Sequence, residues 1–177
     1  MKLIFAVAIC IFAFGASAGA QQSSSEKKAE SQNSLAICPM HDAHSQMNER
    51  GENGMGFSQT ATTQHFLLKT NGGAIRVEVN DPANADGRNS VRMRVIHIAK
   101  VFQKGDFDIP MFVHNTVPSG VPEMKRLRGN IEYSFDETPN GGQVDIFSTD
   151  IAALLVIHEF VRFQIEEHKT GDPTEIR

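Results

Sequence analysis

The sequence predicts an α+β domain in which two duplicated β-hairpin–helix units form a four-stranded antiparallel sheet with two helices on one face. Two hairpin patterns carry the same Gly-Gly pair, and a helical pattern with the signature Val-Ile-His follows each of them. Each helix has an apolar stripe that must be buried, and a shared sheet offers the surface for it. The matching order of strands, glycines and helices indicates an internal repeat.

The first unit is expected over about residues 65–106. Its strands are predicted at 65–70 and 74–80, the turn between them at 71–73 and the helix at 89–104. Alternation of Ile75, Val77 and Val79 is typical of a half-buried strand. The Gly-Gly pair of the turn is expected to supply positive φ angles.

The second unit is expected over about residues 131–172. Its strands are predicted at 131–137 and 143–148, the turn between them at 139–142 and the helix at 150–168. A proline-rich connection, 107–130, joins the units and holds a short helix over about 122–128. A connection of this length in a compact domain is more often functional than idle.

The two long helices share a stripe that should pack on the sheet. Its members are Val91, Val95, Ala99 and Phe102 in the first and Ala152, Val156, Phe160 and Phe163 in the second. His97 is expected to meet solvent. His158 is expected to face a second apolar surface, formed with Ile151, Leu154, Val161 and Ile165 and covered by the proline-rich connection or another subunit. The two histidines are read as a metal-ligand pair or as repeat residues with one buried copy; we favour the second reading. His168 is explained by a favourable helix-dipole interaction when protonated.

Residues 1–20 have the pattern of a secretory signal peptide. Lys2 precedes an apolar run over 3–14, and small residues lead to Ala20. Twelve apolar residues are too few to span about 30 Å of hydrocarbon. We therefore expect a periplasmic or secreted protein cleaved near Ala20, with no membrane span in the mature chain.

The mature chain is long enough for one domain. Loss of Lys2 moves the formal net charge from −4 to −5, which argues against a nucleic-acid partner. Residues 21–56 are expected to be a flexible lead-in with a short helix over 39–50 that stops at Gly51, and the domain follows over 57–172. Cys38 is the one cysteine left after cleavage, so it is free, metal-bound or bridged to another chain.

A group of soft donors stands in the lead-in. Met40, His41, His44 and Met47 would form a single stripe of the predicted helix, and Cys38 stands just before it as a further candidate ligand. Thiolate, thioether and imidazole ligands favour copper, with zinc second. His114 is the best additional donor from the domain, ahead of His65, Met111 and Met124. The alternative is a solvated lead-in whose methionines dock on the domain.

Two resemblances add to this. Cys38-Pro39-Met40-His41 resembles the core of the heavy-metal-binding segment of bacterial copper and silver efflux proteins, and the resemblance covers these four residues. It implies Cys38, Met40 and His41 as ligands. The lead-in Met55-Gly56-Phe57 and the closing segment 158–172 are similar to those of a group of small, uncharacterised exported bacterial proteins.

The sequence therefore predicts an exported binding module for a soft transition metal such as copper. The alternative is an interaction domain that forms a homodimer, or binds a protein partner, through the apolar outer face around His158. Catalysis in a cleft under residues 107–122 is a third reading. No G-x-S-x-G, phosphate-binding glycine loop or H-E-x-x-H pattern occurs in the sequence, so we favour a binding protein over an enzyme.

Overall fold

A computed structural model of the chain describes residues 39–176, with side chains from His44 onward, and all of them belong to one unit. The predicted signal peptide and Cys38 lie outside the described residues. The elements in chain order are α1 (Pro39–Met55), β1 (Thr62–Lys69), β2 (Gly72–Val79), α2 (Ala85–Gln103), α3 (Asp108–His114), α4 (Val121–Arg126), a 3-10 turn η1 (Arg128–Asn130), β3 (Glu132–Thr138), β4 (Gly141–Phe147) and α5 (Ile151–His168).

The predicted α+β class and four-stranded antiparallel sheet are confirmed. The strand order is β1-β2-β4-β3, so the two hairpins meet along β2 and β4 at the centre of the sheet. Ile75 pairs with Val144 in the middle of this junction. Gly72 pairs with Phe147 at one end and Glu78 pairs with Gly141 at the other. The register is therefore symmetric about the central pair, as two equivalent units would produce; a common origin of the units stays a prediction.

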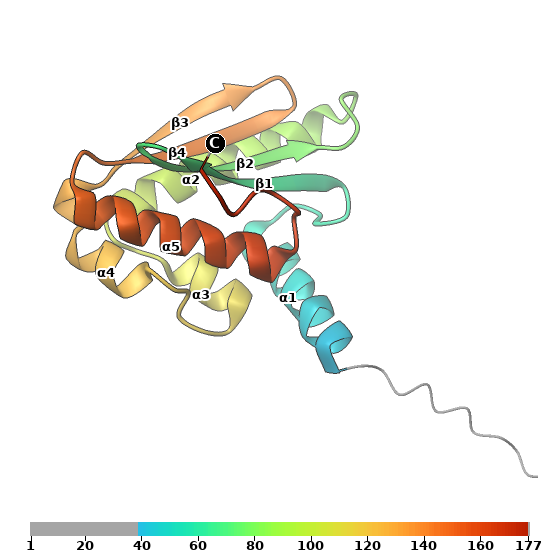
Figure 1. The fold of residues 1–177 in the computed structure, drawn as a ribbon. Coiled ribbons are helices and arrows are strands. Elements are labelled where there is room, and N and C mark those ends of the chain that lie inside the picture. Colours follow the sequence, from blue (N-terminus) through green and yellow to red (C-terminus); the bar gives the residue numbers. More distant parts are fainter. Residues whose placement is uncertain (1–38, 177) are drawn as a thin grey trace, which may run out of the picture. The chain divides into compact units, whose positions relative to one another are not determined.

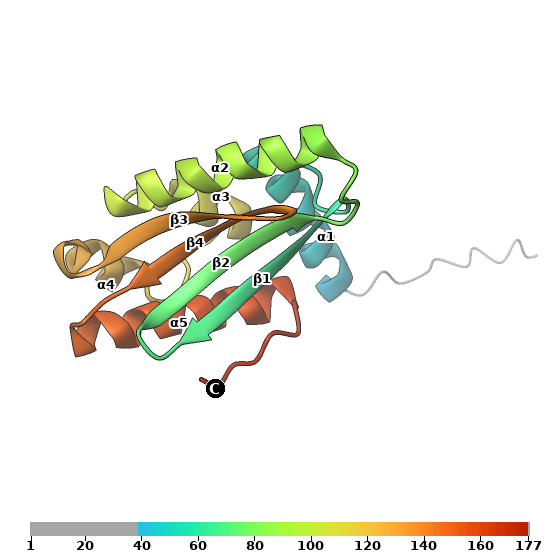
Figure 2. The same cartoon turned by 90° about the horizontal axis from the view of Figure 1, so that it is seen from above.

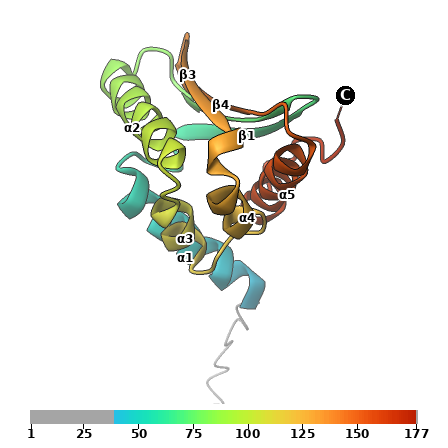
Figure 3. The same ribbon diagram turned by 90° about the vertical axis from the view of Figure 1, so that its left-hand side faces the viewer.

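Both long helices cover the same face of the sheet, as predicted (Figures 1 and 2). The helix α2 packs mainly on β4 and β3, whereas α5 packs mainly on β1 and β2. Each helix thus covers chiefly the hairpin of the other unit. On the side of these helices away from the sheet, α1, α3 and α4 form a further layer, which Figure 3 shows end-on. Contacts of α1 with α3, and of α4 with α5, hold that layer in place.

The hydrophobic core lies between the sheet and the helices. Three rings from different elements meet in it: Phe102 stacks on Phe107 with centroids 4.4 Å apart, and Phe160 meets both edge-on at 6.1 Å. The fully buried large residues are Phe107, Phe160, Met124, Ile131, Ile146, Ile157, Val77, Val91, Val95, Val121, Val144 and Val161. Among the helices of residues 39–176, none has the length and apolar content that crossing a bilayer requires.

The glycine pairs of the hairpins have a different role from the predicted one. Of the four glycines only Gly72 has a positive φ, of 148°. A Cβ on Gly72 would overlap the carbonyl oxygen of Ile146, and a Cβ on Gly141 would overlap that of Val77. The turn prediction was therefore wrong for most of these glycines; they let β2 and β4 approach each other closely.

The two faces of α5 were predicted the wrong way round: the side with Phe160, expected to pack on the sheet, faces the helical layer, and the side with Val161 faces the sheet. Val161 and Ile157 point at Gly73 of the sheet, and the His158 ring binds the Lys69 carbonyl oxygen through Nε2 at 2.9 Å. Phe160 faces the helical layer, close to Gly120. Because α5 lies between the sheet and that layer, both sides of the helix are apolar, and periodicity cannot tell which side meets the sheet. The face around His158 is therefore not an outer face. In α2 the predicted stripe is buried and His97 is exposed, as expected.

The sequence pattern placed the start of α1 correctly at Pro39, but it misplaced the C-terminal end of that helix and missed α3. Gly51 does not stop α1, which continues to Met55 and ends at Gly56, where φ is 72°. Helix α3 was predicted as irregular connection because Pro110 stands in it. That proline lies in the first turn, where a backbone N–H has no helical acceptor, so it is tolerated.

Candidate functional site

Two of the predicted ligands line the same cleft. His44 of α1 and His114 at the end of α3 border a cleft of about 490 Å³, with Met47 and Arg50 on one side. Glu166, Glu167 and Lys169 at the end of α5 close the other side. The helical layer thus brings together residues that lie far apart in the chain.

The position of α1 follows from its contacts with α2 and α3. Arg50 donates a 2.8 Å hydrogen bond from Nε to the Val113 carbonyl oxygen, and Arg94 of α2 donates one of 2.7 Å to the Met55 carbonyl oxygen. Met47 is buried. Gly54 allows the Phe112 ring to come close, since a Cβ there would lie 3.1 Å from it. These contacts hold α1 in place and therefore determine the direction in which its His44 side faces.

The remaining predicted ligands are not all placed. Cys38 lies outside the described residues, as do the side chains of Met40 and His41, which belong to the first turn of α1. The Nδ1 atom of His44 lies 3.3 Å from the amide nitrogen of Asn48. Within the part of the chain that the structure describes, no three His, Cys, Asp or Glu side chains are arranged to hold a metal ion.

The other donors considered for completing the site lie away from the cleft and have contacts of their own. Met124 is fully buried in the core. His65 on β1 holds Asp172 through a 2.9 Å contact between Nδ1 and a carboxylate oxygen. The sulfur of Met111 lies 4.0 Å from the ammonium nitrogen of Lys125. Of the donors outside the lead-in helix, only His114 reaches the cleft among the residues described.

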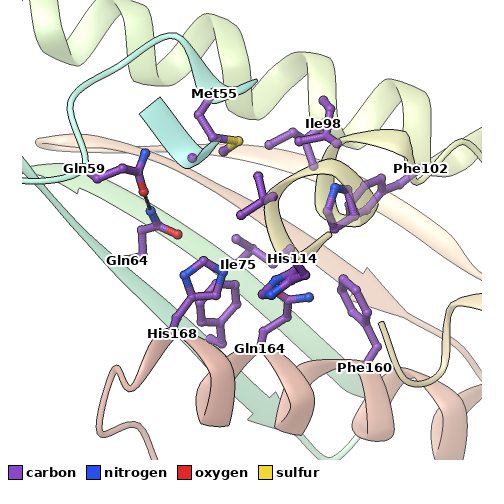
Figure 4. A pocket seen from close by; sticks show the side chains of 15 residues that line it. Met55, Gln59, Gln64, Ile75, Ile98, Phe102, His114, Phe160, Gln164 and His168 are labelled. Carbon is purple, nitrogen blue, oxygen red and sulfur yellow. Dashed lines mark hydrogen bonds between the residues drawn. The ribbon is translucent and has the colours of Figure 1, made fainter. Parts of the chain in front are cut away.

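An inner cavity of about 50 Å³ lies beside the cleft, and His114 borders both. Figure 4 shows Phe160, Gln164 and His168 on the α5 side of this cavity, with His114 next to Gln164. Met55 and Ile98 lie on the opposite side. Gln59 and Gln64, which hydrogen-bond to each other, lie at a third side. The cavity is therefore apolar with a small number of amide and imidazole groups.

His114 and Gln164 form a buried polar pair. The imidazole Nε2 and the amide Oε1 are 3.0 Å apart, which makes the nitrogen the donor. His114 is 9% exposed and Gln164 is 3% exposed. The other polar atoms, Nδ1 of His114 and Nε2 of Gln164, have no hydrogen-bond partner among the described residues. Buried polar atoms are rarely left in this state, so the pair is a candidate for a further polar contact.

Burial keeps both imidazoles of the cavity neutral. Desolvation lowers the pKa of His114, and the hydrogen bond to Gln164 only partly opposes it. Desolvation, with smaller contributions from the nearby His114 and His44, lowers the pKa of His168 to about 3. The prediction of a protonated His168 at the helix end was therefore wrong, because its ring is packed against Phe66 and His114 at centroid distances of 5.1 and 4.9 Å.

The chain after α5 fixes the position of His168. The helix ends at Lys169, which has a left-handed φ of 52°. Asp172 then accepts hydrogen bonds from the backbone N–H of Phe66, at 2.9 Å, and from Thr170. Burial would raise the pKa of Asp172, but these bonds and His65 outweigh it and lower that pKa. Asp172 thereby ties this segment to β1, and the His168 ring stacks on Phe66 of the same strand.

Sequence reasoning missed Gln164 as a site residue and misjudged His168. A signal was present, because the two residues are four apart in α5 and therefore share a face of the helix. A glutamine within an apolar stripe indicates a buried amide that requires partners.

The geometry gives little support to catalysis at His114. A histidine with a lowered pKa in a cleft is a candidate base. Its ring, however, bonds to the amide of Gln164 and packs edge-on against Phe163 and His168, at 5.0 and 4.9 Å. None of these partners is a nucleophile that a base would activate.

No protein-family model, curated protein or solved structure matches this chain.

Proposed function

We propose that this protein is an exported binding module that holds a soft transition metal, copper first and zinc second, at the cleft lined by His44 and His114. The proposal rests on one observation: two ligands chosen from the sequence, on helices that β1, β2 and α2 separate along the chain, border the same cleft.

The state of the imidazoles supports this proposal. A metal binds the neutral form of histidine, so a protonated ring must first lose its proton. Burial lowers the pKa of His114 and therefore keeps the ring neutral at neutral pH. Its Nδ1 atom has no partner among the described side chains. The Nδ1 lone pair takes part in no hydrogen bond to the described residues, so a metal would bind it without breaking the bond to Gln164 once the buried ring turns toward the cleft.

The lead-in would complete the coordination. In α1, Met40 and His41 precede His44 by four and three residues, one helical turn. Cys38 stands just before the helix. Two histidines alone are a weak site, and a thiolate or thioether donor raises the preference for copper over hard cations. The account therefore needs at least one ligand from the segment 38–41.

Titration calorimetry of the mature protein with Cu(I), Cu(II) and Zn(II) tests the proposal. We expect copper to bind more tightly than about 10 μM, and the double variant Cys38→Ser, His41→Ala to weaken binding at least about tenfold. His97→Ala is the matched control, because this exposed histidine lies on α2, away from the cleft. Binding weaker than about 10 μM, or binding that the double variant leaves unchanged, contradicts the proposal.

A second candidate function is self-association through the first turns of α5. Ile151 and Leu155 are 76% and 64% exposed and lie four residues apart, so they share one face. With His158 buried, this pair replaces the predicted surface. Light scattering at rising concentration, with Leu155→Glu as the disrupting variant, separates the two cases. A protein that stays monomeric at high concentration rules out this candidate.

A further inference from the structure

We infer that the open edge of β3, with the groove beside it, binds an extended peptide segment of another protein, which adds a strand to the sheet. The segment carries an aliphatic residue and an acidic residue on the side that faces α2. This surface shares no lining residue with the proposed metal cleft, so the inference does not depend on metal binding.

The strand β3 is the open edge of the sheet. The order β1-β2-β4-β3 leaves one side of β3 without a neighbouring strand, at the margin of the sheet nearest α2 (Figure 2). The backbone N–H of Tyr133 points to this side, where the side-chain oxygen of Gln103 accepts it at 3.2 Å. Because backbone groups alternate in direction along a strand, those of Phe135 and Glu137 point the same way. No described residue binds the Phe135 backbone there, whereas Asp172 covers β1 at the opposite edge.

The side chain of Gln103 already pairs with this edge as a neighbouring strand would. Its amide nitrogen donates to the Ile131 carbonyl oxygen at 3.3 Å, and its oxygen accepts from the Tyr133 N–H. An amide group that bridges two residues of a strand in this way has the hydrogen-bond pattern of a peptide group in a ladder. At the other end of β3, Arg92 binds the Thr138 carbonyl oxygen at 2.8 Å. The stretch between these two contacts stays open for a partner.

A groove of about 400 Å³ lies beside this edge, between β3 and α2. The rings of Tyr133 and Phe135, with Ile96 and Ala99 of α2, give it apolar walls. Directly opposite residues of two paired strands point to the same face of a sheet. Every second residue of an added strand therefore enters the groove, and the one opposite Phe135 meets apolar surface. Removal of that surface from water favours an aliphatic side chain at this position.

Two lysines make one end of the groove electropositive. Lys100 and Lys104 are exposed and lie one helical turn apart on α2, and neither forms an ion pair with a described residue. Among the described residues that line the groove there is no Asp or Glu. This end of α2 lies beside the start of β3, since Gln103 contacts Tyr133. An acidic side chain opposite Tyr133, next but one to the aliphatic residue, complements the lysines.

A second copy of this chain fits the edge poorly. The strand β3 carries Glu132, Asp136 and Glu137 and no basic residue. Antiparallel pairing of two β3 strands would bring the acids of both copies together, and like charges on neighbouring strands destabilise a sheet. Glu132 and Asp136 lie on the face away from α2, where they favour lysine at the intervening positions of a partner. The occupant is therefore aliphatic and acidic toward α2 and basic on its other face.

The peptide acetyl-Thr-Lys-Leu-Lys-Glu-Thr-amide has this pattern and is titrated into isotope-labelled mature protein in EDTA, followed by NMR. We expect the backbone amides of 133–138 to shift, with a dissociation constant below about 1 mM. The same peptide with N-methylleucine keeps every side chain but loses the N–H that pairs with the Phe135 carbonyl oxygen, so it should bind at least about tenfold more weakly. Equal binding of the two peptides, shifts only outside β3 and α2, or no shift at about 5 mM overturns the inference.

A double-mutant cycle tests the charges. Glutamine in place of the peptide's glutamate should weaken binding to wild type about threefold, the modest effect of an exposed ion pair, and should change nothing in the double variant Lys100→Gln, Lys104→Gln. Lys169→Gln, the same change outside the groove, is the matched control and should respond as wild type does. An equal loss in the double variant overturns the inference. So does broadening of the Phe135 amide with protein concentration in the absence of peptide, because a second copy would then occupy the edge.

Discussion

Acidification from about pH 7 to about pH 4.5 should destabilise the metal-free protein, with His168 as a main cause. The ring is packed against Phe66 and His114, and burial lowers its pKa from 6.5 to about 3. Below about pH 6.5 the unfolded chain therefore takes up a proton that the folded chain does not. The free energy of unfolding falls as the pH falls, down to about pH 3.

The magnitude follows from the two pKa values. One pKa unit corresponds to about 1.4 kcal/mol, and over the roughly two pH units below pH 6.5 the unfolded chain carries close to one more proton than the folded chain. His168 alone should cost about 2.5 kcal/mol over this interval. The pKa of His114 is lowered too, so it acts in the same direction. Asp172 and Asp145 have lowered pKa values, and the stability they add is lost only below about pH 4.

Urea unfolding at several pH values, in EDTA, measures this effect. His168→Phe should remove about 2.5 kcal/mol of the pH dependence while keeping a ring on Phe66. His97→Phe, at an exposed position on α2, should leave the dependence unchanged. A wild-type stability that is flat between these pH values, or a His168→Phe variant as sensitive to acid as wild type, would refute the reasoning.

Three further changes test the packing. Gly141→Ala should cost about 2–4 kcal/mol by denaturant unfolding, because its Cβ would overlap the Val77 carbonyl oxygen; Gly129→Ala, with open space around it, should lie within about 0.5 kcal/mol of wild type. Phe160→Ala should cost about 3–5 kcal/mol, since the ring is fully buried against two others, and a smaller loss in thermal unfolding would mean the core collapses into the space. Arg50→Ala removes the 2.8 Å bond from α1 to α3, so amide exchange should speed up in α1 and stay unchanged in the sheet.

The sheet and its two long helices could be predicted because local pattern determines them. Alternation in β2 and the stripe from Val91 to Phe102 are properties of neighbouring residues. The start of α2 was placed too late, at residue 89, because the cap Asn84 was not recognised. The roles of the glycine pairs could not be predicted, because they depend on how closely β2 approaches β4 across the sheet. That approach is a tertiary property, absent from any single hairpin pattern.

The site was predictable only in part, for a related reason. Donor chemistry selected His44 and His114 from the sequence, but their proximity depends on α3, which Pro110 concealed. Gln164 was overlooked because an amide within an apolar stripe has no consequence until its neighbours are known. His168 was assigned a charge because its place at a helix end favours one, whereas burial against Phe66 excludes it.

Anomalous diffraction at the copper edge, from crystals of the mature protein grown with copper, tests the central claim most directly. The account predicts one strong peak in the cleft, about 2 Å from an imidazole nitrogen of His44 and of His114, with a further ligand from residues 38–41. A peak on other side chains, or copper bound only at exposed positions such as His97, would contradict it.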